Sequence, residues 1–432
     1  MEDEDETLAN SIKANLYSDS PLSAKCCIFR VPEVLRRSYE NVYEPDIVAI
    51  GPFHRGKKIL QPMENVKRWY LESHLKSMNI NILSLIKGIK ELEKDARECY
   101  QEPIELNQRD FIEMMIIDGF FLIQLFRKEA DFDLRSKDDP IFNMACMHKY
   151  LYHDLLLLEN QLPWFILETL FNLIKPNDHK NFSLIELVLN FFRTYFSMTN
   201  RYETRFRMDI ENLHILDLIR HVLVSSYSDA DHTSTSIDKA VEDKPDLIPC
   251  VTRLLGTGVI FTKGSPDSMM NIEFENGIFV VPPLSIHETT EPLFRNLIAF
   301  EQCYHSCDNK ITSYAILMDS LINTSRDVEY LSEQGIIDNW LSAEDASHFF
   351  NRLYINTFVT DFYYAKLCKR VNSYYKTKWH RWKATLMRDY FRTPWTIISI
   401  LAACLLLALV VLHTFYTIKL YYSYNFHRIP HK

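Results

Sequence analysis

The chain has 432 residues, of which 47% are hydrophobic and 24% are charged, a composition typical of a globular protein with a large core. Only 9 residues are glycine, so few positions suit tight turns or phosphate-cradling loops, which argues against nucleotide-binding architectures. Residues 1–365 carry 36 Lys or Arg against 56 Asp or Glu, whereas residues 366–432 carry 12 Lys or Arg against one acidic residue. The acidity of residues 1–365 argues against contacts with nucleic-acid phosphates there, because such contacts need Lys and Arg.

The first 25 residues are expected to form a flexible acidic N-terminus. Met1 is followed by five consecutive acidic residues, so the basic and then apolar pattern of a secretory signal peptide is missing. The 9 cysteines are odd in number and dispersed along the chain, which does not fit the disulfide framework of a small secreted protein. We therefore expect mainly reduced, buried thiols.

A soluble, mostly helical domain is predicted over residues 26–341, beginning with an extended or irregular block. The apolar segment 111–126 contains Glu113 and Asp118, and as a helix it would span only about 24 Å. It is too short to cross a membrane, so it predicts a buried core helix, with a capping box of Asp110 and Glu113 at its start. Further helices are predicted at 63–100, 143–159, 163–174, from Ser183 (with a capping box of Ser183 and Glu186), 291–305, 309–323 and 326–334.

A strand-rich insert interrupts the helical pattern at about residues 249–290, after a polar surface loop over 225–245. Short β-branched or aromatic runs in this insert are typical of strands. Glu275-Asn276-Gly277 separates two of these runs, and Asn-Gly is a strong hairpin signal. The predicted fold class is therefore mainly α, a helical globular head with a small β-hairpin element.

Basic and aromatic residues are frequent toward the end of residues 342–392, which we expect to form a long basic stem helix. Residues 395–418 contain no Asp, Glu, Lys or Arg. As a helix they would extend roughly 36 Å, enough to cross a hydrocarbon core of about 30 Å. One C-terminal transmembrane helix is therefore predicted, followed by a short tail over 419–432.

Aromatic residues mark the two predicted membrane interfaces, with Trp395 at one end and Tyr416, Tyr421 and Tyr422 at the other. Nine Lys or Arg lie in residues 366–392 and three follow the span, so the positive-inside rule places the head in the cytosol. The basic stem would also meet anionic lipid headgroups. Plasma membrane and endomembrane are not distinguished by these features.

Local motifs for catalysis or cofactor binding are incomplete. Gly51 to Lys58 has the glycine spacing of a phosphate-binding loop, but Lys58 stands where a Mg²⁺-binding Ser or Thr is required, and Pro52 removes a backbone donor. Cys303 and Cys307 have the spacing of a zinc-ligand pair, but no second pair accompanies them. These motifs predict no catalytic, cofactor-binding or metal-ligating residue.

Carboxylates in apolar surroundings leave an enzymatic alternative open. Glu113 and Asp118 in the apolar helix, and Glu159 beside two amide residues, would have perturbed pKa values if they shared an apolar pocket. The structural alternative is that these carboxylates are bonded to backbone donors in a packed core. A closed pocket into which the three acids converge would distinguish the two.

Several blocks of sequence can be compared with a known family. The most specific are Leu-Glu-Asn-Gln-Leu-Pro at 158–163 and Asn-Leu-Ile-Ala-Phe-Glu-Gln at 296–302. The remaining blocks are Cys27–Pro32, Tyr43–Gly56, Met63-Glu64 with Lys67, Asp118–Leu122, Asp154–Phe165, Pro282–Leu284 and Gly335–Ile337. In order and spacing they resemble the plant family called domain of unknown function 247, or uncharacterised protein family 0481. The resemblance implies a plant protein with one C-terminal transmembrane helix and no assigned enzymatic activity.

The leading hypothesis is a membrane-anchored protein-interaction or recognition module, because an acidic helical head without catalytic motifs stands on a basic stem with a single anchor. The resemblance also implies a link to self-incompatibility in grasses, which suggests recognition or signalling. Membrane lipid would be contacted by the C-terminal helix and the stem, and a protein partner by the head. A role at the cell surface would favour an outward head, where the sequons at Asn181 and Asn323 would matter, in conflict with the charge rule. The alternative is an enzyme with a buried carboxylate site in the head.

Overall fold

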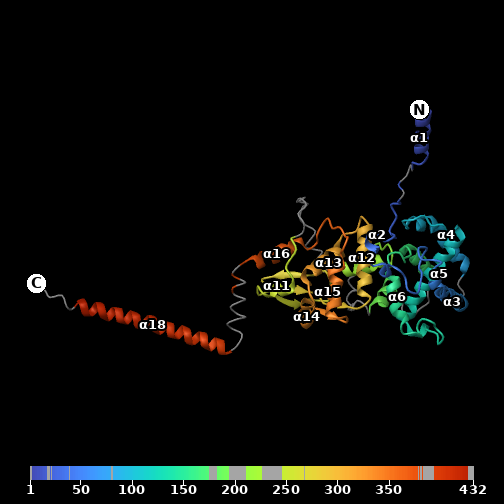
Figure 1. Ribbon diagram of the computed structural model, residues 1–432. Helices are drawn as coiled ribbons and strands as arrows, with labels where there is room; N and C mark the ends of the chain where they lie inside the picture. The colour runs from blue at the N-terminus through green and yellow to red at the C-terminus, as the bar shows by residue number, and fades with distance from the viewer. Residues whose placement is uncertain are drawn as a thin grey trace.

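The computed structural model describes residues 2–16, 22–37, 39–78, 81–174, 182–193, 211–225, 246–266, 268–377 and 394–426, together with residues 20, 379 and 382. Helices dominate these residues and the strands are short, so the mainly α class is confirmed. Figure 1 shows a head of packed helices and small sheets, with α1 (Glu2–Ala14) at one end and α18 (Pro394–Phe426) at the other.

Helix α5 (Gln108–Ala130) is the centre of the N-terminal half of the head. It is buried from Phe111 to Lys128 except at Glu113, because other helices surround it. The predicted buried helix is thus confirmed. Its N-cap is Asn107, whose side chain accepts a hydrogen bond from the N–H of Asp110 at 2.9 Å, so the capping box predicted here was wrong. The helices packed against it are α3 (Gln61–Met78), α4 (Ile82–Glu98), α7 (Trp164–Ile174) and α8 (Leu184–Phe192).

Shorter helices complete this half. The capping box of Ser183 and Glu186 is confirmed at the start of α8, where each side chain bonds the other residue's backbone N–H. The predicted helix at 143–159 is shorter in the structure, as α6 (Met147–Leu155). The remaining short elements are α2 (Glu33–Arg36) and the 3-10 turns η1 (Glu40–Tyr43), η2 (Lys58–Leu60) and η3 (Phe132–Leu134).

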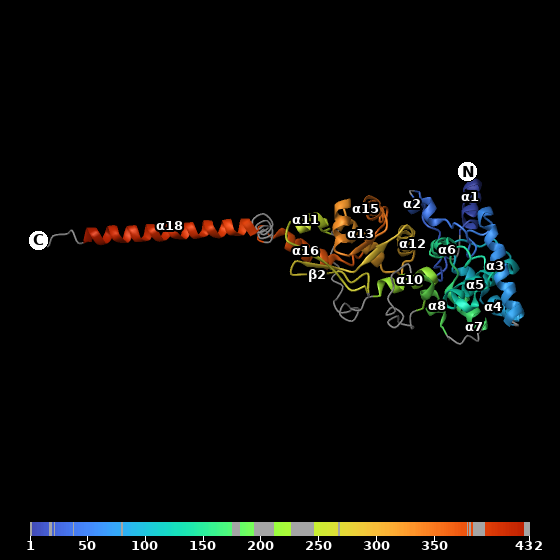
Figure 2. The ribbon, with the colours of Figure 1, turned by 90° about the horizontal axis from the view of Figure 1, so that it is seen from below.

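The C-terminal half combines helices with two small sheets. Strands β1 (Ile260–Lys263), β2 (Glu273–Glu275) and β3 (Ile278–Val281) form one sheet in the order β1-β3-β2. β4 (Leu284–Ile286) pairs in parallel with β5 (Ile337–Asn339). The helices here are α11 (Val251–Leu255), α13 (Lys310–Leu321), α14 (Ser325–Glu333), α15 (Ala343–Arg352) and α16 (Ala365–Lys376). Figure 2 shows α10 (Ile215–Val224) and α12 (Thr290–Cys303) between the two halves.

The predicted β-hairpin is confirmed by the antiparallel pairing of β2 with β3, in which Glu275 lies opposite Ile278. The two residues of the turn, Asn276 and Gly277, have φ values of 51° and 86°. Positive φ at both central positions is what a two-residue type I′ turn requires, and Asn-Gly adopts it at low cost. The hairpin signal was therefore a reliable local one.

Two expectations about the ends of the head differ from the structure. Residues 2–14 form α1, where a flexible N-terminus was expected. The stem is not one helix from residue 342, because α15 ends at Arg352 and α16 begins only at Ala365. Both helices bury apolar residues in the head, and the ring of Tyr374 packs edge-on against Phe274 of β2 at 5.5 Å. The surface loop expected at 225–245 and most of residues 378–393 lie outside the described residues.

Candidate functional site

An extended segment, residues 46–51, is held by buried polar side chains and not by a neighbouring strand. Asp154, near the end of α6 and 0% exposed, accepts hydrogen bonds from the backbone N–H groups of Asp46, Ile47 and Val48, each at 2.8 Å. One carboxylate therefore satisfies three consecutive donors that would otherwise be buried without a partner.

Asn160 and Asp118 continue this pattern along the same segment. Asn160 Oδ1 accepts from the N–H of Ile50 at 2.7 Å, and Asn160 Nδ2 donates to the carbonyl of Val48 at 3.0 Å. Asp118 Oδ2, in the middle of α5, accepts from the N–H of Gly51 at 2.9 Å. Side chains that are distant in sequence thus play the part that a paired strand would play.

Lys67 of α3 places a positive charge opposite Asp118. Its Nζ lies 2.5 Å from Asp118 Oδ1 and 2.5 Å from Glu64 Oε1, and it donates to the carbonyl of Ala49 at 2.7 Å. Burial raises the pKa of Asp118, while the Lys67 ammonium acts in the opposite direction. The ion pair joins α3 and α5 to the extended segment.

Glu159 is the centre of a second buried cluster. Its side chain is 1% exposed and accepts hydrogen bonds from the N–H of Val31 at 2.7 Å and from Arg30 Nη1 at 2.9 Å. Arg36 also donates to this carboxylate. Both cations have higher pKa values than a free arginine, because their acidic partners outweigh partial burial. Glu159 is thus a structural anion that fixes the start of the extended block.

His54 lies between the two acids of this cluster without bonding either. Its Nε2 is 3.6 Å from Glu159 and its Nδ1 is 3.5 Å from Glu44, and neither ring nitrogen forms a hydrogen bond within the described residues. Burial lowers the pKa of His54 to about 4, so the ring is neutral near pH 7.

The three candidate carboxylates do not converge in a pocket. The Glu113 side chain is 47% exposed and lies 3.9 Å from Arg68. Asp118 and Glu159 bond backbone donors and cations in two separate clusters. These contacts match the structural alternative for buried acids, so the enzymatic hypothesis gains no support from them.

The segment from Gly51 to Lys58 forms turns that lead into η2, which begins at Lys58. Lys57, which would face a phosphate in a P-loop, instead donates to Glu44. Cys303 and Cys307 are free, half-buried thiols, and burial raises the pKa of each to about 12. A protonated thiol is a poor metal ligand.

Among the described residues, Asp46, His153 and Asp154 form the one group whose ligand atoms lie within 4.8 Å of one another, as a metal site requires. Both carboxylate oxygens of Asp154 already accept backbone N–H groups. His153 Nδ1 lies 2.9 Å from Asp154 Oδ1 and 3.5 Å from Asp46. Asp154 is therefore used in hydrogen bonds with His153 and with the backbone, and Asp46 lies within ion-pair distance of His153.

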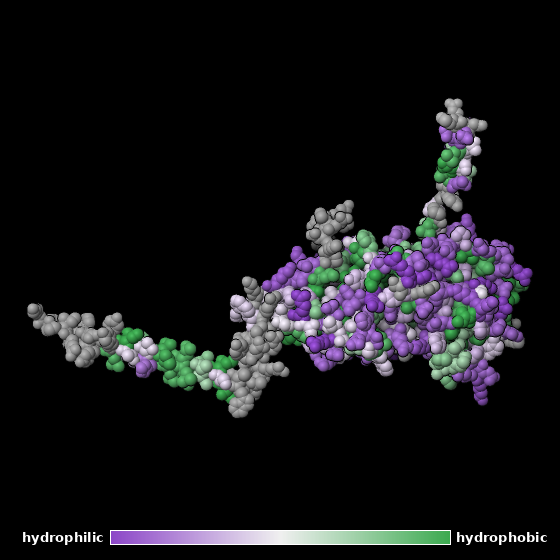
Figure 3. Space-filling model, viewed as in Figure 1, coloured by the Kyte–Doolittle hydropathy of each residue, from purple (hydrophilic) through white to green (hydrophobic). Residues whose placement is uncertain are grey.

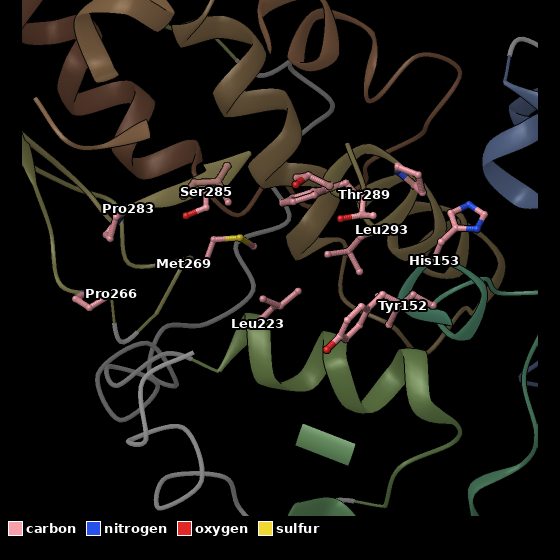
Figure 4. A pocket seen from close by; sticks show the side chains of 14 residues that line it. Tyr152, His153, Leu223, Pro266, Met269, Pro283, Ser285, Thr289 and Leu293 are labelled. Atoms are coloured by element: carbon pink, nitrogen blue, oxygen red, sulfur yellow. The ribbon is translucent and has the colours of Figure 1, made fainter. Parts of the chain in front are cut away.

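A cavity of about 100 Å³ lies where the two halves of the head meet (Figure 4). Its wall comes from α6, the end of α10, the loop before β2, strand β4 and the start of α12. The lining is mostly apolar, with polar groups at Ser285, Thr289 and His153. The sequence held no local signal for this cavity, because its residues come from separate segments spread between Tyr152 and Phe294.

The C-terminal helix α18 contains one stretch, Ile398–Leu420, that is long and apolar enough to cross a membrane. It overlaps the predicted span, and none of its hydrophobic window is buried in the structure. Of the four predicted interface residues, Tyr416 is 59% exposed. Trp395, Tyr421 and Tyr422 belong to α18 by their backbone, and their side chains lie outside the described ones.

Comparisons with known proteins agree with the resemblance. A family model described as DUF247, plant protein of unknown function, matches residues 28–409. UPF0481 protein At3g47200 of Arabidopsis thaliana is 30% identical over 423 residues, which cover 92% of this chain and 87% of that protein. Putative UPF0481 protein At3g02645 of the same plant is 24% identical over 494 residues, covering 94% and 92%. No solved structure matches the chain.

Proposed function

The chain belongs to the DUF247 family of plant proteins, and from this premise we propose that it is a single-pass membrane protein whose head binds a protein partner in recognition or signalling. The observation that supports the membrane anchor is the exposed apolar stretch Ile398–Leu420 of α18. Figure 3 shows its hydrophobic surface apart from the largely hydrophilic head. The proposal concerns the anchor and the head together, because tethering brings an interaction surface to a membrane.

The apolar side chains of α18 need an apolar surrounding. Leu405, Leu406 and Leu407 are 64%, 62% and 69% exposed. Burying one such side chain stabilises a structure by about 1.5–3 kcal/mol, so leaving a whole helix of them in water is strongly unfavourable. A bilayer supplies that surrounding, and all the backbone groups of a helix are bonded internally.

The basic residues before the span support a cytosolic head. Nine Lys or Arg lie in residues 366–392, against three after the span. Residues 1–365, with 20 more acidic than basic side chains, would favour a partner with a basic surface. Such electrostatic complementarity mainly accelerates association and weakens with salt.

Membrane fractionation of the full chain tests the anchor. We expect the chain to stay in the pellet after a high-salt wash and an alkaline carbonate wash, whereas a chain truncated after Arg392 is released. A chain truncated after Leu420 retains the span and is the matched control. If the Arg392 truncation remained in the pellet after both washes, α18 would not be the anchor.

Protease protection in sealed microsomes tests the orientation. A tagged head that faces the cytosol is digested without detergent, which is the expected result. Asn323 is exposed just before α14, so an outward head would carry glycan there, and the Asn323→Gln variant would migrate faster on a gel. A protected, glycosylated head would reverse the proposed orientation and favour recognition at the cell surface.

A further inference from the structure

The cavity between the two halves of the head is lined by residues of α6, α10, β4, α12 and the loop before β2. We propose that it takes a small neutral molecule, one aromatic ring or a branched hydrocarbon of that size, that bears a single hydroxyl or carbonyl group. This inference does not depend on the membrane anchor, because every wall of the cavity belongs to the head.

The size of the cavity limits the ligand. Its volume of about 100 Å³ is similar to that of apolar protein cavities, about 150 Å³, that stay dry and bind benzene. Figure 4 shows Leu223 of α10, Met269 and Leu293 of α12 around one space, so the walls come from three separate segments. A single flat ring fits such a space, whereas a nucleotide is too large for it.

The lining also limits the charge of the ligand. Among the described residues that line the cavity, none is Lys, Arg, Asp or Glu. A carboxylate or an ammonium group would therefore lose its hydration without meeting an opposite charge, and that loss is costly. The ligand that the lining favours is uncharged.

Polar groups at the wall favour a ligand with one polar function. The hydroxyl of Thr289 makes no hydrogen bond in the described part of the chain, whereas Ser285 Oγ donates to Asp338 at 3.2 Å. When His153 Nδ1 donates to Asp154 at 2.9 Å, Nε2 carries the lone pair. A ligand hydroxyl can donate to Nε2 of His153, and either a hydroxyl or a carbonyl can accept from Thr289.

Fluorine NMR with two probes of matched size tests the proposal on the full chain in detergent micelles. We expect 4-fluorobenzyl alcohol to show saturable binding and 4-fluorobenzoate to bind at least tenfold more weakly. Thr289→Val removes the hydroxyl at nearly constant volume and is expected to weaken binding of the alcohol a few-fold.

Variants that fill the cavity distinguish binding of the probe inside it from partition of the probe into the detergent micelle. Leu223→Trp and Met269→Trp add an indole to two different walls and are expected to weaken binding at least tenfold. Leu83→Trp makes the same change on α4 at a side chain that is 61% exposed, so it reports partition of the probe into detergent. Should Leu223→Trp fail to fold, Met269→Trp, in a loop, decides the question. Unchanged saturable binding in the filled variants, no saturable binding at all, or equal binding of the two probes would overturn the proposal.

Discussion

Lys67 Nζ and Asp118 Oδ1 lie 2.5 Å apart inside the head, and each side chain is only 1% exposed. Each member of the pair also bonds the extended segment, Lys67 through the carbonyl of Ala49 and Asp118 through the N–H of Gly51. Because these bonds satisfy both charges, the cost of burying them is offset. The pair therefore sets the position of the segment relative to α3 and α5.

Replacing Lys67 with methionine keeps the bulk of the side chain and removes its charge. Asp118 is then buried without a cation, and breaking such a pair typically costs about 3–5 kcal/mol. We expect the free energy of unfolding, measured in urea on the full chain in micelles, to fall by that amount. Arg68→Met is the control, since Arg68 and Glu113 join the same two helices at 3.9 Å while 60% and 47% exposed. The free energy of unfolding of the control should change by less than about 1 kcal/mol. Equal losses in the two variants would contradict a special role for the buried pair of Lys67 and Asp118.

Gly51 has a φ of +73°, and a Cβ there would lie 2.7 Å from the carbonyl oxygen of Gln161 and 3.0 Å from the hydroxyl of Tyr100. Gly51→Ala should cost the roughly 1–2 kcal/mol of a left-handed backbone and, in addition, the displacement of Gln161. Gly56→Ala is the matched control, because Gly56 has a φ of +88° with nothing within 4 Å of a Cβ. The melting temperature should therefore fall further in Gly51→Ala than in Gly56→Ala. An equal fall in both variants would mean that the close approach of residue 51 to Gln161 is unimportant.

The elements that could be predicted from the sequence are those set by local patterns. The apolar run of α5, the box of Ser183 and Glu186, and the turn at Asn276-Gly277 each depend on residues a few positions apart. The break in the expected stem was missed, although Asn356, with a φ of 64°, is a residue type that favours a left-handed turn.

The polar clusters and the cavity could not be predicted in the same way. The bond from the N–H of Asp46 to Asp154 joins residues 108 positions apart, and that from Leu158 to Asn296 spans 138. The blocks around these residues carried the family resemblance, yet nothing local shows that one side chain faces the backbone of another block. Tertiary packing alone brings them together, as it does the walls of the cavity.

We expect His214 to make the stability of the protein depend on pH. Its Nδ1 accepts from the N–H of Asp217 at 3.1 Å and its Nε2 lies 3.1 Å from the carbonyl of Cys27, so the neutral ring is fully bonded and a second proton has no acceptor. Burial lowers the pKa of His214 from 6.5 to about 4. Between these values the unfolded chain binds the proton and the native protein does not. Stability is therefore complete above about pH 6.5 and declines as the pH falls toward 4, by about 3 kcal/mol from this residue.

The His214→Asn variant isolates this contribution. Asparagine can still cap α10 through the N–H of Asp217, but it does not titrate. We expect the variant to be less stable than the natural protein at pH 7, since the bond to Cys27 is lost. The difference between their free energies of unfolding, measured in urea, should narrow as the pH falls from 6.5 to 4. A constant gap across this range would show that His214 is not responsible, because other buried groups such as His54 are unchanged in the variant.

Asn160 is the point where a nearly isosteric change should be most damaging. Its Nδ2 donates to the carbonyls of Val48 and Asp154 at 3.0 and 2.9 Å, and the residue is 1% exposed. Asn160→Asp replaces this donor with a second oxygen, so two acceptors lose their bonds and face a buried charge. We expect a loss of about 3 kcal/mol or more in the free energy of unfolding. Asn143→Asp, an exposed position with one comparable bond to the carbonyl of Lys137 at 2.6 Å, should lose under about 1 kcal/mol. Similar losses at the two positions would mean that residues 46–51 are held mainly by apolar packing.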